Sequence, residues 1–374
     1  MTSTERREMR YHRRVAQRQA KKQTRNAMHD CFDQVFSYDN LYQSYQKCRR
    51  NVAWKASVQR YITQAPLLLK QTHDKLQAGA FKSSGFYEFD LYERGKRRHI
   101  RSVTTHERVV QRCLCDNALV PVLGRTFIYD NGASLERKGY TFAANRVTKH
   151  LRDHYRRYGD SGYVLIFDFS KFFDRVSHRL VKEILEREFS DDRIKAITEQ
   201  FIDDFGDVGM GLGSQISQVL ALASANRLDH FIKEKCGIRG YVRYMDDGIL
   251  IHHSKKHLQH CLDAIRTVCA KLEITLNEKK TQIVKISHGF TFIKIRFYLL
   301  PSGRIIKKMN HRSVTKMRQK LKVFREKVDA GIMRYSDVYQ SWQSWRAYAS
   351  NFNAYHTIQS MAALYNELFI FTSP

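Results

Sequence analysis

The chain has 374 residues, with 65 Lys and Arg against 37 Asp and Glu, so its formal net charge is +28. This length suffices for one large domain or two to three smaller ones, with a core that needs no disulfide framework. The positive excess is far beyond what solubility requires. It points to a polyanionic partner, with nucleic acid ahead of a membrane surface, over a generally basic surface without a partner.

The N-terminal segment, residues 1–26, carries nine Lys or Arg and only two acids, Glu5 and Glu8. It is either a flexible arm or a solvated helix that grips phosphates, or else a tail without a role. Residues 36–80 follow, with leucines and tyrosines at helical spacings and Gly79 as the expected C-terminal cap.

Residues 86–103 predict a β-hairpin, because acidic and apolar residues alternate up to the turn sequence ERGKRR. The tip and return strand are basic. Beyond the hairpin, the apolar spacing predicts a helix over residues 105–123 and a basic amphipathic helix over residues 145–158.

The middle of the chain alternates between strand and helix patterns. Residues 162–169 form a short, continuously apolar run that ends near Asp168, as a buried strand does. The sequence YMDD lies in a predicted pair of short strands around a tight turn, residues 241–253, with Gly248 beside it. The remaining expected elements are helices at 177–205, 219–236, 257–272, 312–330 and 336–366, strands at 274–286 and 290–300, and a small-residue loop at 209–218.

Three carboxylates stand out against this pattern. Asp168 ends one strand, and Asp246 and Asp247 occupy the tip of a hairpin 78 residues later. If the hairpin pairs beside the first strand, the three side chains meet at one end of a sheet, where like charges suppress ionisation. Divalent cations relieve that repulsion, and oxygen ligands suit Mg²⁺. Two such ions are the recurrent device for in-line attack at phosphorus, so the sequence predicts nucleotidyl transfer.

The seven cysteines are odd in number and form no CxxC pair, so neither a zinc site nor a disulfide framework is expected. No apolar run approaches the roughly 18 residues of a membrane span, and the basic N-terminus lacks the apolar region of a signal peptide. We therefore expect a cytoplasmic protein without a membrane partner.

Five motifs together resemble a known family. FDFSKFFDRVSH (167–178), GLGSQISQ (211–218), YMDD (244–247), LNEKKTQ (276–282) and FTFIKIRF (290–297) stand in the order of successive reverse transcriptase motifs. The chain resembles a compact prokaryotic reverse transcriptase from about residue 36 onward. The pair Ser217-Gln218 is similar to the enzymes of diversity-generating retroelements, whereas DNGASLERKGYTFAANRV (130–147) is closer to unclassified bacterial reverse transcriptases, several of which serve in antiviral defence.

The resemblance implies roles for individual residues. Asp168 and Asp246 hold two Mg²⁺ ions, with Mn²⁺ as a substitute, while Asp247 assists and the carbonyl of Phe169 is a further ligand. Phe173 takes the position of the aromatic gate beneath the sugar 2′ carbon. Either Lys279 or Lys280 is the lysine that protonates the leaving pyrophosphate.

The same resemblance implies the nucleotide site. Four basic residues on the hairpin clamp the triphosphate of the incoming dNTP: Lys96, Arg97, Arg98 and Arg101. Gly213, Ser217 and Gln218 line the floor beneath the templating base. Two positions depart from the retroviral pattern. Leu212 replaces a glutamine, which puts a polar contact to the sugar in doubt, and FIK (292–294) replaces FLG, so that Lys294 is left to contact phosphate.

The C-terminal region is expected to bind nucleic acid. Residues 304–327 contain ten Lys or Arg and one acid, Glu326, and Trp342 and Trp345 follow at helical spacing. These features indicate a thumb along a template–primer duplex. The aromatic residues either form its core or contact an unpaired base. The expected nucleic-acid contacts are Arg13, Arg14, Lys21, Lys22, Lys294, Arg312, Lys316 and Lys320.

Taken together, the sequence predicts an α+β right-hand polymerase with an arm (1–35), fingers (36–160), palm (161–300) and thumb (301–374). Its expected partners are an RNA template, a DNA primer and product, dNTPs and a dedicated structured non-coding RNA, together with a protein partner or a second copy of the chain. Two alternatives remain open: a template-independent or protein-primed nucleotidyltransferase on the same palm, and a non-catalytic RNA-binding scaffold. The bulky Phe173 and the intact aspartates argue against them.

Overall fold

A computed structural model of the chain describes residues 2–93, 96–211 and 213–370, without the side chains of residues 93, 96 and 98. The chain divides into two compact units. Unit 1 comprises residues 1–129, 169–231 and 266–275, and unit 2 comprises residues 130–168, 232–265 and 276–374.

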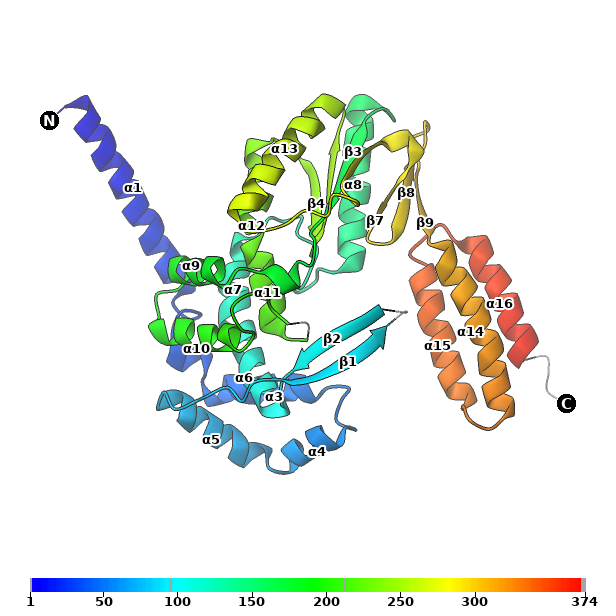
Figure 1. Ribbon diagram of the computed structural model, residues 1–374, viewed down its shortest axis with the longest axis horizontal. Coiled ribbons are helices and arrows are strands. Elements are labelled where there is room, and N and C mark those ends of the chain that lie inside the picture. Colours follow the sequence, from blue (N-terminus) through cyan, green and yellow to red (C-terminus); the bar gives the residue numbers. More distant parts are fainter. Residues whose placement is uncertain (1, 94–95, 212, 371–374) are drawn as a thin grey trace. The chain divides into compact units, whose positions relative to one another are not determined.

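Unit 1 consists mainly of helices and carries one two-stranded hairpin (Figure 1). Its helices are α1 (Ser3–Asn26), α2 (Phe32–Val35), α3 (Tyr38–Arg49), α4 (Ala56–Thr63), α5 (Ala65–Gln77), α6 (Thr105–Leu114), α7 (Val120–Leu123), α9 (His178–Glu188), α10 (Asp192–Asp203), α11 (Gln215–Ser224) and α12 (Asn226–His230). Short 3₁₀ turns lie at Gly124–Thr126 and Phe173–Arg175, and a π-helical turn at Cys115–Leu119 joins α6 to α7.

Several helical predictions for unit 1 are confirmed, and two are wrong in detail. Gly79 follows α5 with a φ of +65°, and its amide donates to the carbonyl of Leu76, as a glycine cap does. The single helix expected over residues 177–205 is in fact two, because the Asp191 side chain caps the start of α10. The expected loop at 209–218 ends early, since α11 begins at Gln215.

The predicted hairpin is confirmed in unit 1. Strand β1 (Tyr87–Glu93) pairs antiparallel with β2 (Lys96–Ser102). Tyr87, Phe89 and Leu91 share one face of β1 and are exposed, whereas Glu88 and Asp90 lie on the other face. Because successive strand residues point to opposite faces, the hairpin has one apolar face and one charged face.

Unit 2 contains a four-stranded antiparallel sheet in the order β4–β5–β3–β6. Its strands are β3 (Tyr163–Asp168), β4 (Gly240–Tyr244), β5 (Asp247–His252) and β6 (Gln282–Lys285). Helix α8 (Tyr140–Tyr158), which begins five residues earlier than predicted, packs Val147 and Leu151 into a core shared with Val164, Val242 and Ile249. A π-helical turn lies at Phe231–Lys235, and α13 (Lys255–Lys271) begins in unit 2 and ends in unit 1.

A second sheet in unit 2 corrects the prediction for residues 290–300. These residues form a hairpin of β7 (Phe290–Phe292) and β8 (Ile295–Leu299), not one strand, and β9 (Ile305–Met309), which was not predicted, joins β8. Ile293 and Lys294 make the turn with φ angles of 44° and 65°, a two-residue turn with both residues left-handed. A 3₁₀ turn at Ile286–His288 precedes β7, and the strand expected over 274–286 is limited to β6.

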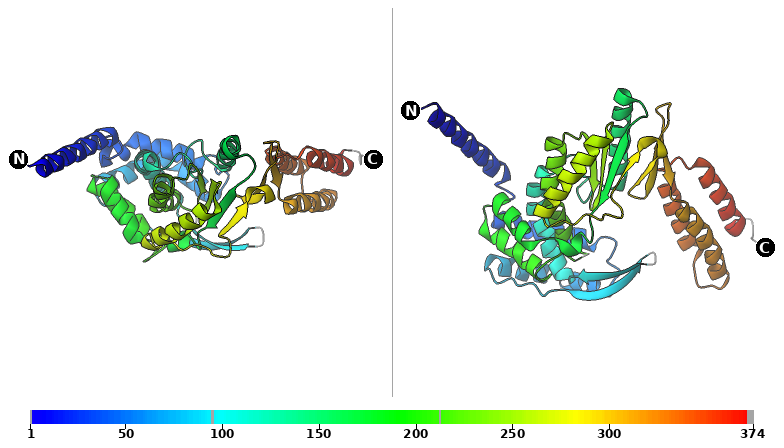
Figure 2. Two further views of the ribbon diagram at one scale, coloured as in Figure 1. Left: turned by 90° about the horizontal axis from the view of Figure 1, so that it is seen from above. Right: turned by 45° about the horizontal axis from the view of Figure 1, so that its top comes forward.

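The chain continues into a bundle of three helices, α14 (His311–Asp329), α15 (Tyr335–Ala349) and α16 (Tyr355–Phe369) (Figures 1 and 2). The single helix expected over 336–366 is therefore wrong, because the chain reverses between α15 and α16. Trp342 stacks on both Trp345 and Tyr365, with ring centroids 5.6 and 5.3 Å apart. Trp342 and Trp345 are buried, so they form the core of this bundle. Among the described residues, none of the helices combines the length and apolar character that a membrane crossing needs.

Candidate active site

The three predicted carboxylates lie at one end of the four-stranded sheet in unit 2. Asp168, the last residue of β3, is the cross-strand partner of Asp247, the first residue of β5. Tyr244 of β4 pairs with Asp247, so Met245 and Asp246 form the two-residue turn between these strands. The hairpin therefore places two aspartates beside the strand end that carries the third.

The turn itself is conformationally strained. Met245 has a φ of 54°, in the left-handed region that residues other than glycine rarely occupy. Such a conformation costs on the order of 1–3 kcal/mol and persists where the surrounding structure fixes it. The guanidinium of Arg243 donates a hydrogen bond of 2.8 Å to the carbonyl of Met245 and so stabilises the turn.

Arg243 was not among the predicted site residues. It is fully buried in β4. Its amide donates to the carbonyl of Asp130, and its carbonyl accepts from the amide of Gly132. The sequence did carry a signal for this residue: Arg243 is a cation in the middle of an apolar strand pattern. A charge buried in such a strand needs partners.

Asp130, whose carbonyl accepts from the Arg243 amide, is the centre of a buried cluster of charged side chains. Arg146 and Lys233 donate to its carboxylate, the latter at 2.7 Å, and the His150 ring lies 3.1 Å away. Burial opposes ionisation of Asp130, but these bonds and the charge of Lys233 hold its pKa well below its usual range. Asp130 is thus held through its carboxylate by Arg146 and Lys233, and through its carbonyl by the amide of Arg243.

Gly248 shows why a glycine follows the two aspartates. It is the cross-strand partner of Phe167, and a Cβ atom at this position would lie 2.1 Å from the Phe167 ring. The ring fills the space that a side chain would take. This close approach sets the spacing of β3 and β5 at the strand ends that carry the carboxylates.

Burial and neighbouring carboxylates disfavour the ionisation of Asp246 and Asp247. Burial raises the pKa of Asp246, and the neighbouring Asp168 raises it further. For Asp247, burial together with the charges of Asp246 and Asp168 raises the pKa to about 7. The site therefore holds negative charge that neighbouring cations would stabilise.

Lys280 supplies one such cation. Its ammonium group lies 2.8 and 2.9 Å from the two carboxylate oxygens of Asp168, and the Asn277 side chain donates to the same carboxylate at 3.1 Å. The hydrogen bond to Asp168 raises the pKa of Lys280. Both candidate lysines are exposed, and Lys280 is the one whose ammonium group contacts the Asp168 carboxylate. Asn277 is a further site residue that sequence reasoning did not name.

The raised pKa of Asp247 predicts a pH dependence of stability. Because the folded state binds this proton more tightly than the unfolded chain does, its contribution favours folding at low pH and is lost as the pH rises from about 4 to about 7. At about 1.4 kcal/mol per pKa unit, the upper limit is about 4 kcal/mol. We expect Asp247→Asn in EDTA to unfold at a higher temperature than wild type at pH 8 and to gain clearly less at pH 5. Equal gains at both pH values would contradict this assignment.

The segment after Asp168 belongs to unit 1. Phe169 and Phe172 are buried with ring centroids 5.0 Å apart, and Phe173 is only partly buried at the start of a 3₁₀ turn. The carbonyl of Phe173 accepts from the amide of Met210 at 2.7 Å. Phe173 is therefore more exposed than Phe172, which is a core residue.

The hairpin cations are paired with acids of the opposite strand. Arg97 lies 2.6 Å from Asp90, and Arg101 lies 2.9 Å from Glu88. Arg101 also donates to the carbonyl of Phe205. The side chains of Lys96 and Arg98 lie outside the described part of the chain. Within what is described, the expected clamp consists of ion pairs on an exposed face, so a triphosphate would have to compete for these two arginines.

The small-residue loop contacts the hairpin within unit 1. A Cβ atom on Gly213, whose φ is +118°, would lie 3.0 Å from the carbonyl of Arg101. Gln218 is exposed on α11, whereas Ser217 is buried. The loop thus brings Gly213 and the hairpin together, and Ser217 faces the helical core. Leu212 lies outside the described residues.

The expected nucleic-acid contacts lie mostly on exposed surface. Arg13, Arg14 and Lys21 are exposed on α1, but Lys22 is taken up by an ion pair of 2.8 Å with Glu188. Lys294 is exposed in the turn between β7 and β8. Exposed basic residues on α14 include Arg312, Lys316 and Lys320.

No group of three or more His, Cys, Asp or Glu side chains in the described ranges is arranged as a ready-made metal site. Asp246 and Asp247 each interact electrostatically with Asp168, whose carboxylate accepts hydrogen bonds from Lys280. Their donor chemistry nevertheless fits a hard divalent cation, because all three offer oxygen ligands and repel one another when ionised.

Residues 88–297 match the family described as reverse transcriptase (RNA-dependent DNA polymerase). This match covers more than half of the chain and includes the carboxylate strands, the 3₁₀ turn with Phe173 and most of the hairpin. The chain belongs to the reverse transcriptase family, with the right-hand polymerase fold of that family.

Similarity to individual proteins is more distant. The chain is 25% identical over 251 residues to protein YkfC of Escherichia coli K12, covering 53% of this chain and 62% of that one. Among solved structures, apo telomerase of Candida tropicalis truncated from its C-terminal domain has 16% identity and a TM-score of 0.45, covering 60% of this chain and 55% of that one. Telomerase of Candida albicans with the TWJ fragment of telomeric RNA has 12% identity and a TM-score of 0.47, covering 78% and 62%. The chain thus spans less than two thirds of each of these proteins.

Proposed function

We propose that the chain is an RNA-directed DNA polymerase that adds dNTPs to a primer. The observation that supports this most directly is the convergence of Asp168, Asp246 and Asp247 at one sheet end in a chain of the reverse transcriptase family. The net charge of +28 suits a template–primer substrate.

We assign the three aspartates and the carbonyl of Phe169 as the groups that hold two Mg²⁺ ions, or Mn²⁺ in their place. When bound, these ions would activate the attacking hydroxyl and neutralise charge on the leaving group. Lys280, whose ammonium group donates to the Asp168 carboxylate, would give a proton to the departing pyrophosphate. Arg97 and Arg101, with Lys96 and Arg98, would hold the triphosphate once released from their acidic partners. Gly213 and the exposed Gln218 would lie beneath the nascent base pair.

The organisation into an arm, fingers, palm and thumb remains part of this proposal. The basic hairpin lies within the proposed fingers, residues 36–160, and the carboxylate sheet lies within the proposed palm, residues 161–300. The three-helix bundle lies within the proposed thumb, residues 301–374, where Arg312, Lys316 and Lys320 are exposed for phosphate contacts. Lys294, exposed at the turn between β7 and β8, would make a further contact.

Primer extension on poly(rA)/oligo(dT) tests the function. We expect incorporation of dTTP that depends on both the template and Mg²⁺ and that EDTA stops. Product formed without a template would favour the template-independent alternative. Binding of the template–primer without any product over a range of Mg²⁺ and Mn²⁺ concentrations would favour the scaffold alternative.

The gate assignment gives a separate prediction. Because Phe173 is only partly buried and Phe172 is buried against Phe169, Phe173→Ala should admit ribonucleotides without disturbing the core. We expect the ratio of rNTP to dNTP incorporation to rise by at least about tenfold, since a removed steric contact of 1.4 kcal/mol corresponds to that factor. Phe173→Tyr, which keeps the ring, is the matched control. An unchanged ratio in Phe173→Ala would exclude this residue as the gate.

For the biological setting, we propose a dedicated structured non-coding RNA as partner, in antiviral defence or in a diversity-generating retroelement. A protein partner or a second copy of the chain is part of the same proposal. Sequencing the RNA and DNA that co-purify with the protein would separate these settings. A single abundant structured RNA is the expected result, and a random sample of cellular RNA would argue against a dedicated partner.

A further inference from the structure

Helix α1 is a long helix with almost no packing of its own. Of its 24 residues, Asn26 alone is buried among those described. The Thr2 hydroxyl accepts from the amide of Glu5, and the Glu5 carboxylate accepts from the amide of Thr2, which closes a capping box at the N-terminus. Local capping therefore supports a helix that the core does not hold.

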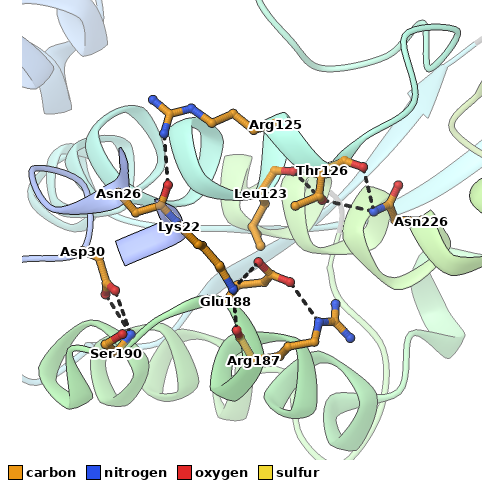
Figure 3. Close-up of polar contacts among 10 residues, drawn as sticks. All are labelled: Lys22, Asn26, Asp30, Leu123, Arg125, Thr126, Arg187, Glu188, Ser190 and Asn226. Carbon is orange, nitrogen blue, oxygen red and sulfur yellow. Dashed lines mark hydrogen bonds and ion pairs between the residues drawn. The ribbon is translucent and has the colours of Figure 1, made fainter. Parts of the chain in front are cut away.

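The base of α1 is anchored by several contacts within unit 1 (Figure 3). Lys22 lies 2.8 Å from Glu188 and donates to the carbonyl of Arg187. The Arg125 guanidinium donates to the side chain of Asn26 at 3.0 Å. Just beyond the helix, both carboxylate oxygens of Asp30 accept from the amide of Ser190.

The anchor keeps Glu188 in its charged form. Burial opposes ionisation of Glu188, but hydrogen bonds from Lys22 and Arg187 hold its pKa below the usual value. Figures 1 and 2 show α1 joined to the other helices of unit 1 at its C-terminal end. The first five turns thus extend from a fixed base.

The exposed basic residues of α1 gather on one side. At 3.6 residues per turn, eight of the nine fall within about 140° of the helix circumference. We call this side the basic face; it consists of Arg6, Arg7, Arg10, Arg13, Arg14, Arg18, Lys21 and Arg25. Over the 19 steps from Arg6 to Arg25 it is about 29 Å long. The ninth cation, Lys22, points to the anchor.

This arrangement costs stability in the absence of a polyanion. Arg6, Arg10, Arg14 and Arg18 follow one another at four-residue spacing, where like charges destabilise a helix by about 0.2–0.5 kcal/mol per pair. A helix that only contacts water gains nothing from a row of arginines at this spacing. An array of phosphates would turn each of these repulsions into an attraction.

We propose that α1 is a preformed docking helix for double-stranded RNA, which its basic face contacts along the phosphates. A straight, rigid stripe of cations is matched to the regular phosphate array of a duplex more than to a flexible single strand, for which stacking aromatics are the usual contact. The basic face carries only one aromatic residue at its edge, Tyr11. The inference deepens the RNA partner of the proposed function and rests on it.

A membrane surface fits less well. Helices that lie on membranes bury a continuous apolar face. The side of α1 opposite the basic face instead carries the acids Glu5 and Glu8 and polar residues such as Gln19 and Gln23 between its few apolar ones. Duplex RNA therefore matches this helix better than a membrane surface does.

The test compares two variants of the full chain with equal charge changes. Arg10→Gln/Arg14→Gln/Arg18→Gln removes three charges from the basic face, and the control Ala16→Glu/Gln19→Glu/Gln23→Glu adds three negative charges on the opposite side. All six positions are exposed. The Debye length of about 8 Å at 0.15 M salt is shorter than the helix diameter, so the two faces are distinguishable.

The probe is an RNA duplex of about 20 base pairs of arbitrary sequence, comparable to the roughly 16 base pairs that compact duplex-binding domains span. We expect the basic-face variant to bind it at least about tenfold more weakly, with a salt slope smaller by up to about 3, one for each lost phosphate contact. The control variant should stay within about twofold of wild type. Equal losses in both variants would overturn the assignment of the face.

A second variant tests whether the helix must be preformed. Ala16→Pro keeps every charge but interrupts the exposed helix at a cost of about 3 kcal/mol. We expect a loss of duplex affinity similar to that of the basic-face variant, with a matching loss of helical circular dichroism. Unchanged affinity would mean that a flexible basic tail suffices. Equal affinity of wild type for a single strand of the same length, or binding to anionic vesicles but not to RNA, would likewise overturn the proposal.

Primer extension on poly(rA)/oligo(dT), measured on the same preparations, separates this inference from the proposed function. Loss of duplex binding with retained extension supports the docking helix as a separate surface. Extension that is absent already in wild type contradicts the proposed function, while the duplex-binding comparison still decides the inference about α1.

Discussion

Asp246→Asn is expected to abolish DNA synthesis while the protein stays folded and still binds RNA. The amide keeps the shape of the side chain at the turn but removes a charge that would hold a metal ion. Loss of one such ligand is worth several kcal/mol of transition-state stabilisation, so we expect a reduction on the order of 1000-fold in kcat. The measurement is single-turnover dTTP addition to a preannealed template–primer.

The metal-free stability of Asp246→Asn should be higher than that of wild type, although its activity is lower. Because burial and Asp168 both raise the pKa of Asp246, its ionised form is disfavoured in the metal-free fold, and the neutral amide relieves that repulsion. Asp207→Asn, the same change at an exposed side chain outside the helices and strands, is the control and should alter neither property. Synthesis by Asp246→Asn within tenfold of wild type would contradict the assignment of the carboxylates.

The parts of the fold that the sequence predicted depend on local patterns. The apolar run before Asp168 and the YMDD hairpin carry their strand signals within a few residues, and both elements are confirmed. The turn at Ile293 and Lys294 carries no such signal. Neither residue is typical of a left-handed turn, and tertiary packing of β7 and β8 imposes the conformation.

The break between α15 and α16 was missed for a similar reason. Residues 350–354 contain neither proline nor glycine, so the helical periodicity continues through the reversal. The burial of Trp342 against Tyr365 requires the two helices to fold back on each other, and that contact is invisible in a local window. The prediction of helical structure was correct here, whereas the chain reversal between α15 and α16 was not predicted.

The carboxylates of the candidate site were predictable because acidic residues are unusual within apolar strand patterns. The residues that hold these carboxylates in place were not predictable from the sequence. Asn277 and Lys280 reach Asp168 from more than 100 residues away, and Asp130 reaches Arg243 from across a similar interval. The ion pairs of Arg97 and Arg101 with acids on the facing strand depend on the hairpin register, which the sequence pattern left undefined.

The buried arginine beneath the turn gives the second large effect. We expect Arg243→Met to lower kcat by about 100-fold, the loss that a misplacement of about 1 Å produces at a reacting centre. Methionine fills much of the same volume but cannot donate to the carbonyl of Met245, and an unpaired buried carbonyl costs about 1–3 kcal/mol. The strained turn then loses this hydrogen bond, so we expect Asp246 to shift relative to Asp168.

The Mg²⁺ requirement distinguishes positioning from general destabilisation. With Arg243→Met, the Mg²⁺ concentration for half-maximal extension should rise, and amides 244–248 should exchange hydrogen faster in the absence of metal, while RNA affinity is retained. Arg243→Lys, which keeps a donor, should recover part of kcat. Arg239→Met, the same change at an exposed arginine four residues earlier, is the matched control. A folded Arg243→Met protein with wild-type kcat and Mg²⁺ dependence would show that the turn holds its shape without this hydrogen bond.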